Sequence, residues 1–325
     1  MSISGQAVAR QAPQPLPANI RSVQPGGGVC YQVERAWGRL RRWWLKRFRP
    51  AYVRAMAARR QGTDAGAPHE ILDPRDLKDC RNCCDCAWAE ADDPFRWRRR
   101  IPLAPWGAAE LHLAGWPLLA LTVAAGGWAW YLPYGGWAWC LPAIPAAGLA
   151  LLLFFFRNPW RRVPQAAGLL VSPADGTVRE ITPLAHDEFL AGPAIRIGIF
   201  LSIFNVHLNR SPAAARVLAL RYSPGEFLNA LRPESALRNE NMWIGLEEEA
   251  APHGRLVVRQ ISGAIARRIV CTLRPGEVMP RGHVFGMIKL GSRTELILPA
   301  ACAVQVVVGQ KVKAGITVVA RNPKQ

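Results

Sequence analysis

The sequence predicts a mainly β (α+β) domain of short strands, preceded by a transmembrane helical hairpin. Residues 113–156 contain no Asp, Glu, Lys or Arg, a run about twice the roughly 20 residues that one membrane-spanning helix needs. From about residue 163 onward, short apolar runs alternate with Gly and Pro, which is typical of a domain of short strands. One helix is expected within this domain, near residues 226–237. The 325 residues of the chain are enough for one substantial core with accessory segments.

The uncharged run is expected to form two helices, at residues 113–132 and 137–156, because the segment YLPYGG divides it with turn-forming residues. Arginines precede and follow the run, so both of its ends should stay in the cytoplasm. We therefore expect a hairpin in the cell (inner) membrane, within residues 101–156, with the domain that follows on the cytoplasmic side. The alternative is a buried hairpin in a soluble protein. Tryptophans lie near the expected helix ends and turn, where they favour the membrane interface: Trp116, Trp128, Trp130, Trp137 and Trp139.

Residues 1–100 are predicted to form a basic, partly disordered extension, with disorder expected in the Pro-rich and Gly-rich residues 1–30. Residues 31–60 mix large aromatic residues with many arginines, which indicates a basic amphipathic helix broken near Pro50. This helix either lies on an anionic lipid surface or is solvated against its own protein. The net charge of +18 suits a membrane surface or a nucleic acid. The uncharged run favours the membrane, and we expect no nucleic-acid partner.

Four cysteines follow within the segment CRNCCDC: Cys80, Cys83, Cys84 and Cys86. A structural zinc site usually takes two ligand pairs separated by a longer loop, whereas this cluster stands alone. We therefore expect no metal, and metal binding by these four residues is kept as an alternative beside free thiols and lipid-modified cysteines. In the reducing cytosol the eight cysteines of the chain are expected to be unpaired.

Three polar segments of residues 157–325 carry groups that chemistry could use: SPADG with Asp175, FNVHLNR with His207, and LGS with Ser292. Each segment alone is more often a turn or a structural strand residue. Together they permit a carboxylate to orient an imidazole, the imidazole to take a proton from a hydroxyl, and the hydroxyl to attack a carbonyl. The pattern GxSxG is absent, so the hydroxyl does not lie on a strand-to-helix elbow.

Seven segments, in this order, resemble the short bacterial and archaeal form of phosphatidylserine decarboxylase: FFFRNPWRRVP, VSPADGTV, IFLSIFNVHLNRSP, YSPGEFLNA, LRNEN, QISGAIARRIV and FGMIKLGSRTELILP. The resemblance covers roughly residues 150–320. It implies a lyase of phospholipid biosynthesis that converts phosphatidylserine to phosphatidylethanolamine. It also implies a zymogen that cuts itself between Gly291 and Ser292. Ser292 would become a pyruvoyl group (the pyruvate cofactor), which forms a Schiff base with the serine amine of the lipid and accepts the electrons released with carbon dioxide.

The resemblance also implies roles for other residues. His207 would be the base that activates Ser292, and Asp175 would orient His207. Phe204, Asn205 and Asn209 are candidates for binding the substrate, with ordinary strand and turn contacts as the alternative. The expected partners are the phospholipid substrate, an anionic membrane surface, and the large and small fragments of the cut chain, which would stay together as a heterodimer.

Two alternative functions remain at this point. The same chemistry could act on another serine lipid, such as archaetidylserine. The segments SPADGTV and VVVGQKVKAGITVV are also similar to pieces of barrel-sandwich carrier domains, which predicts a barrel-sandwich-like fold and leaves a non-catalytic carrier or scaffold module as the other alternative. A carrier would need a lysine at an exposed tight turn or a pair of phosphorylatable histidines, and neither pattern is apparent.

Overall fold

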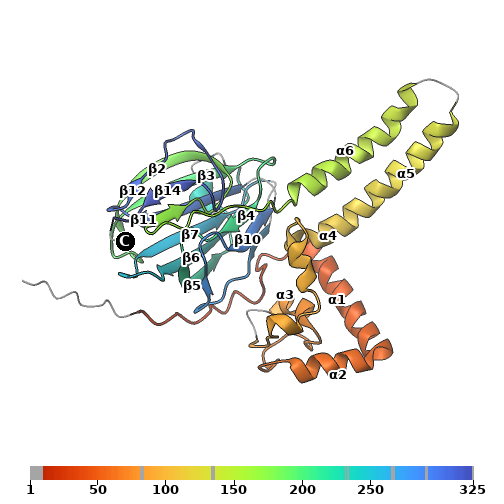
Figure 1. The fold of residues 1–325 in the computed structure, drawn as a ribbon, viewed down its shortest axis with the longest axis horizontal. Helices are drawn as coiled ribbons and strands as arrows, with labels where there is room; N and C mark the ends of the chain where they lie inside the picture. The colour runs from red at the N-terminus through yellow and green to blue at the C-terminus, as the bar shows by residue number, and fades with distance from the viewer. Residues whose placement is uncertain are drawn as a thin grey trace, which may run out of the picture.

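The computed structural model confirms a mainly β protein that is preceded by two apolar helices. In Figure 1 the strands form one body, a long helical hairpin projects from one end of it, and a smaller group of helices lies at the root of the hairpin. The structure describes residues 10–80, 84–132, 136–230, 232, 234–264, 268–289 and 292–323.

Short antiparallel strands make up the β body. Their bounds are β1 (Leu169–Val171), β2 (Gly176–Asp187), β3 (Gly192–Leu201), β4 (Leu208–Arg210), β5 (Ala215–Ser223), β6 (Asn241–Glu248), β7 (Arg255–Ile261), β8 (Arg268–Cys271), β9 (Val278–Met279), β10 (Val284–Lys289), β11 (Ser292–Pro299), β12 (Ala303–Val304), β13 (Lys311–Val312) and β14 (Val318–Arg321). The largest sheet has the order β13-β2-β3-β11-β7-β6-β5-β9. Two smaller sheets have the orders β4-β10-β8 and β1-β14-β12.

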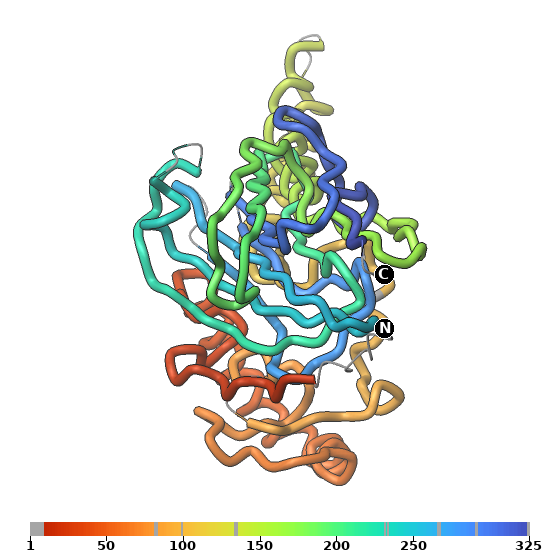
Figure 2. Tube along the Cα trace, turned by 90° about the vertical axis from the view of Figure 1, so that its left-hand side faces the viewer, coloured from red at the N-terminus to blue at the C-terminus, as the bar shows by residue number. Residues whose placement is uncertain are grey.

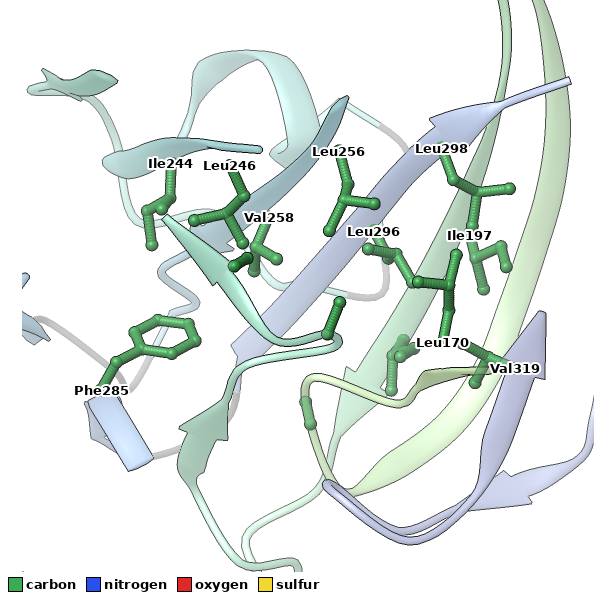
Figure 3. Close-up of a cluster of buried hydrophobic side chains, with 14 of the residues drawn as sticks. Leu170, Ile197, Ile244, Leu246, Leu256, Val258, Phe285, Leu296, Leu298 and Val319 are labelled. Atoms are coloured by element: carbon green, nitrogen blue, oxygen red, sulfur yellow. The ribbon is translucent and has the colours of Figure 1, made fainter. Parts of the chain in front are cut away.

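The core lies where the large sheet meets the two smaller ones. Figure 3 shows Leu296 of β11 beside Ile197 of β3, with Leu170 and Val319 of the β1-β14 sheet close to them. In the register of the large sheet, Leu296 pairs with Ile197 on one side and with Val258 on the other. A slip of one residue would turn these apolar side chains to the opposite face. The core therefore fixes the register of β11, and with it the place where the strand begins.

The hairpin consists of α5 (Trp116–Tyr131) and α6 (Cys140–Phe155). Short helical segments extend both helices, so two stretches, Pro105–Tyr131 and Gly136–Phe155, are long and apolar enough to cross a membrane by length and composition. Only 6% and 17% of their most apolar windows are buried inside the protein, which contradicts the alternative of a buried hairpin. The extending segments are Pro105–Gly107, α4 (Ala108–Glu110), Leu111–Gly115 and Gly136–Trp139.

The N-terminal helices pack at the root of the hairpin. The expected basic helix is α1 (Val29–Phe48), which ends just before Pro50, where α2 (Pro50–Arg59) begins. Because proline is favoured in the first turn of a helix, this break follows from the sequence. The remaining helical segments of this group are Pro74–Asp76, α3 (Leu77–Cys80), Glu90–Asp92 and Arg96–Arg100.

Residues 10–28 differ from the disorder expected of them. They run along the β body before α1 begins, as the red tube in Figure 2 shows. The Gln14 amide donates to the Leu218 carbonyl at 2.7 Å, and the Cys271 amide donates to the Val23 carbonyl at 2.8 Å. Ile20 and Val23 are buried, so these two apolar side chains anchor a segment whose composition alone indicates disorder.

The helix expected at residues 226–237 is much shorter in the structure. Among the residues of this stretch that the structure describes, only those of α7 (Ser235–Arg238) are helical. The Asn239 side chain accepts a hydrogen bond from the Leu228 amide and donates one to the Leu228 carbonyl, both at 2.8 Å. This side chain therefore satisfies the backbone of the loop in place of helical hydrogen bonds.

Candidate active site

Ser292 is the first residue of β11 and pairs with Leu201 at the end of β3. The residue is fully buried, and among the described residues its Oγ has no hydrogen-bond partner. Leaving a buried hydroxyl unpaired costs about 1–3 kcal/mol, so a residue of this kind needs a reason. Gly291, the expected cleavage site, lies outside the described residues.

His207 lies at the end of the loop that connects β3 to β4. Its Nδ1–H donates to the Asn205 carbonyl at 2.9 Å, which leaves Nε2 as the acceptor nitrogen of the neutral ring. Burial, followed by the positive charge of Arg157, lowers the pKa of His207 to about 4, against the opposing effects of the Asn205 carbonyl and of Asp175. The ring packs on Phe155 with centroids 4.5 Å apart. His207 is therefore neutral, and in its base form, at pH 7.

Asp175 lies just before β2, and its carboxylate is held on two sides. Arg161 donates to it in bidentate fashion, from Nη1 to Oδ1 at 2.6 Å and from Nη2 to Oδ2 at 2.8 Å. The Ala314 amide donates to Oδ1 at 2.8 Å. These bonds fix the carboxylate in place, and its negative charge raises the pKa of His207. Its hydrogen bonds in the structure therefore go to Arg161 and Ala314, and its effect on His207 is electrostatic.

The loop between β3 and β4 brings Ser292 and His207 into one region. Ser292 pairs with the residue at which this loop begins, and His207 is the residue with which it ends. The Ile288 amide donates to the His207 carbonyl at 3.1 Å, four residues before Ser292. Asp175 joins the same region, because Arg210, at the end of β4, donates its amide to the carbonyl of Pro173 at 2.9 Å. The fold thus gathers around one loop the three residues that the sequence singled out.

The three residues expected to bind substrate lie in different environments. Phe204 is 62% exposed on the β3–β4 loop. The Asn205 side chain accepts hydrogen bonds from the amide and the hydroxyl of Ser202, both at 2.9 Å, and thereby shapes the same loop. Asn209 is fully buried and donates to the Thr294 hydroxyl at 3.0 Å, two residues beyond Ser292. Phe204 and Asn205 therefore border the site, whereas the Asn209 side chain lies inside the sheet and holds β11.

Several contacts at the site were not expected from the sequence. Arg161 binds Asp175, although the sequence suggested only that it flanks a membrane helix. Arg157 donates to the Phe204 carbonyl at 2.8 Å. Lys289, on the strand that leads to the expected cut, forms a buried ion pair at 2.6 Å with Glu110, the last residue of α4. The only signal for these contacts was the presence of basic residues near both segments.

The cysteine cluster is only partly described, because Cys83 lies outside the described residues. Cys80 and Cys86 are buried, and the Cys84 thiol donates to the Cys80 carbonyl at 3.3 Å. None of the seven cysteines that the structure describes forms a disulfide. Within the described part of the chain, no three His, Cys, Asp or Glu side chains are grouped so that they could hold a metal ion. Burial raises the pKa of the Cys86 thiol to about 11, which keeps it protonated at neutral pH.

Comparison with known proteins assigns the site to a family. The family model described as phosphatidylserine decarboxylase matches residues 149–320, which include Asp175, His207 and Ser292. A curated phosphatidylserine decarboxylase proenzyme from Rhodopirellula baltica is 50% identical over 250 residues, covering 75% of this chain and 98% of the relative. Proenzymes of the same name from Chlorobium chlorochromatii and Nitrosomonas eutropha are 47% and 41% identical, over 53% and 63% of this chain and 80% and 92% of their own lengths. The chain belongs to the phosphatidylserine decarboxylase family.

Proposed function

We propose that this chain is a self-processing decarboxylase that converts phosphatidylserine to phosphatidylethanolamine in phospholipid biosynthesis. The observation that carries the proposal is the buried hydroxyl of Ser292, which has no hydrogen-bond partner among the described residues and lies at the start of a strand, in the same region as a neutral histidine. A turn serine needs neither feature. The family match extends over the whole region that contains these groups.

Self-cleavage needs a nucleophile, a base and a fixed geometry. Ser292 Oγ attacks the carbonyl carbon of Gly291, and His207 Nε2 takes the hydroxyl proton. The peptide bond is thereby exchanged for an ester, and elimination then opens the ester to leave a dehydroalanine at position 292. Water converts this residue to the pyruvoyl group and releases ammonia. Because the chain cuts itself only once, a weak base such as His207 is sufficient, and Asp175 stabilises its protonated form.

The surroundings of Ser292 suit a pyruvoyl group. Ser292 is fully buried, and β11 is hydrogen bonded on both sides, to β3 and to β7. When formed, the group supplies a carbonyl that binds the substrate amine and accepts the electrons of the departing carboxylate. This chain's residues hold the group at the start of β11 and keep water away from it. Asn209, through Thr294, keeps β11 in place, and Phe204 and Asn205 border the path of the lipid.

The hairpin gives the enzyme its place in the cell. We assign residues 101–156 to a membrane anchor in the cell (inner) membrane, and residues 157–325 to a catalytic domain on its cytoplasmic side. The basic N-terminal extension, residues 1–100, contacts the anionic surface. After the cut, β11 remains paired with β3 and β7 of the larger fragment, so the two fragments stay together as a heterodimer.

The intact mass of the purified chain tests the proposal. The wild type should yield one fragment that ends at Gly291 and another that begins at position 292. The N-terminus of the second fragment should be blocked by a carbonyl group that reacts with hydroxylamine. Ser292→Ala should stay whole. Ser262→Ala is the matched control, because Ser262 is also a fully buried serine whose Oγ has no partner among the described residues.

This control variant should cut normally and should release carbon dioxide from phosphatidylserine vesicles. A full-length wild-type chain in a folded preparation would refute self-processing. Two fragments without release of carbon dioxide would refute the substrate.

A further inference from the structure

Helix α1 carries an apolar stripe that nothing in the described structure covers. Its members are spaced three or four residues apart, which places them on one face of the helix: Val29, Val33, Trp37, Leu40, Trp44 and Phe48. Trp37 is 64% exposed and Phe48 is 54% exposed. Single exposed apolar residues are ordinary, whereas a contiguous stripe that includes aromatic rings marks an interaction surface.

The opposite face of α1 fastens the helix to the protein. Leu45 is buried, and Arg42 donates from Nη1 to the buried carboxylate of Asp76 at 2.9 Å. Arg41 binds the same carboxylate, and Glu34 pairs with Lys78. These contacts fix the rotation of the helix about its axis, so the apolar stripe points away from the body of the protein.

The charges of α1 select the kind of surface that could cover the stripe. Glu34 is its only acidic residue, and that side chain is turned toward the protein. Arg39 and Arg47 are exposed, and Arg47 lies within the stripe while Arg39 lies to one side of it. Two copies of this face would bring like charges together, which disfavours self-association. Tryptophans, an apolar stripe and flanking arginines together fit the boundary of an anionic lipid layer.

The position of α1 fits the same surface. The helix packs against α4, which is part of the apolar stretch Pro105–Tyr131. In Figure 1, α1 begins at the root of the hairpin and runs across the direction of α5 and α6. A hairpin that crosses the bilayer would therefore place α1 along the plane of the membrane surface.

We infer that α1 is an interfacial helix whose apolar stripe docks on the anionic phospholipid surface at the root of the hairpin. A consequence follows that rests on the proposed function. Phosphatidylserine carries a net charge of about −1 and phosphatidylethanolamine is neutral overall, so each turnover removes one negative charge from the surface that α1 touches. Docking is then strongest on a membrane rich in substrate and weakens as product accumulates.

The test uses the full chain in lipid nanodiscs, with the photocrosslinking amino acid benzoylphenylalanine in place of Leu40. The matched probe replaces Ala57, an exposed residue of α2 outside the stripe. In discs that contain phosphatidylglycerol, an anionic lipid that is not the substrate, lipid adducts at position 40 should exceed those at position 57 by at least about tenfold. High salt, or phosphatidylcholine alone, should lower the yield at position 40.

The stripe itself is tested by Trp37→Glu with Trp44→Glu, which should abolish the lipid adducts at position 40. Arg54→Glu, an exposed change on α2, should leave them unchanged. Equal yields at positions 40 and 57, or crosslinks to a second copy of the chain, would overturn the inference.

The charge dependence is tested in the inactive Ser292→Ala chain, where discs of phosphatidylserine should give more adducts than discs of phosphatidylethanolamine. Equal adducts in these two lipids would overturn the charge dependence. If the wild-type chain docks on lipid but releases no carbon dioxide from phosphatidylserine, the result would count against the proposed function and not against the docking of α1.

Discussion

The buried ion pair between Lys289 and Glu110 joins β10, the strand before the expected cut, to the root of the apolar hairpin. Replacing Lys289 with Met removes the partner of the Glu110 carboxylate. The Glu110 side chain is only 18% exposed, so water replaces the lost partner only in part. Breaking a buried pair in this way costs about 3–5 kcal/mol, and the partial exposure of Glu110 favours the lower end, about 3 kcal/mol. For a chain of 325 residues, with about 2.1 cal/mol/K of unfolding entropy per residue, such a loss lowers the melting temperature by about 4–5 °C.

The assay is a comparison of thermal unfolding at one scan rate, together with the cut fraction from intact mass. Lys289→Met with Glu110→Gln should recover most of the lost stability, because no buried charge is left unpaired. Lys46→Met is the matched control, since its pair with Glu70 is exposed and is worth less than about 1 kcal/mol. The reasoning would be refuted if the single change at Lys289 melted like the wild type, or if the double change were no better than the single one.

Two further predictions concern the histidine and the hairpin root. The unfolded chain protonates His207 below its ordinary pKa of 6.5, whereas burial and Arg157 lower the folded pKa to about 4, so stability should fall as the pH drops from 6.5 to 4, by about 3 kcal/mol in all. The urea midpoint of unfolding should show this fall in the wild type and not in His207→Gln. An equal dependence of the midpoint on pH in the two proteins would contradict the lowered pKa of His207. Gly107→Ala should lower the melting temperature, because an added Cβ would lie 2.0 Å from the ring of Phe156 at the root of the hairpin. Gly127→Ala in α5 places its Cβ where nothing lies within 4 Å, and this variant should melt like the wild type.

The elements that could be predicted from the sequence are those with a local signal. The bounds of the two hairpin helices could be predicted to within a few residues, because the absence of charged residues can be read directly from the sequence. The pairing of β11 with β3 was not predictable, since it joins Leu296 to Ile197 across about a hundred residues of chain. Residues 10–28 were expected to be disordered because composition does not show that Ile20 and Val23 find a buried place on the β body.

The candidate site residues could be named from the sequence, whereas the contacts that hold them in place could not. Asp175, His207 and Ser292 were named from three short segments and a family resemblance. The arginine that holds Asp175 lies in a segment whose positive charge has a simpler explanation as the flank of a membrane helix. The Lys289–Glu110 pair spans 179 positions, so no local pattern could reveal it. Support of this kind depends on packing between distant segments, and it appears only once the fold is known.

The root of the hairpin packs directly against the candidate active site. Phe155, in the last turn of α6, covers the His207 ring, and Arg157 follows it by two residues. Burial and the charge of Arg157 are what lower the pKa of His207, so the end of α6 sets the pKa of the residue that we propose as the base. In the proposed function, the substrate head group would reach the site from that same end of the hairpin, because its acyl chains stay in the bilayer. The anchor therefore does more than raise local concentration: separating the hairpin from the β body would expose His207 and change the base itself.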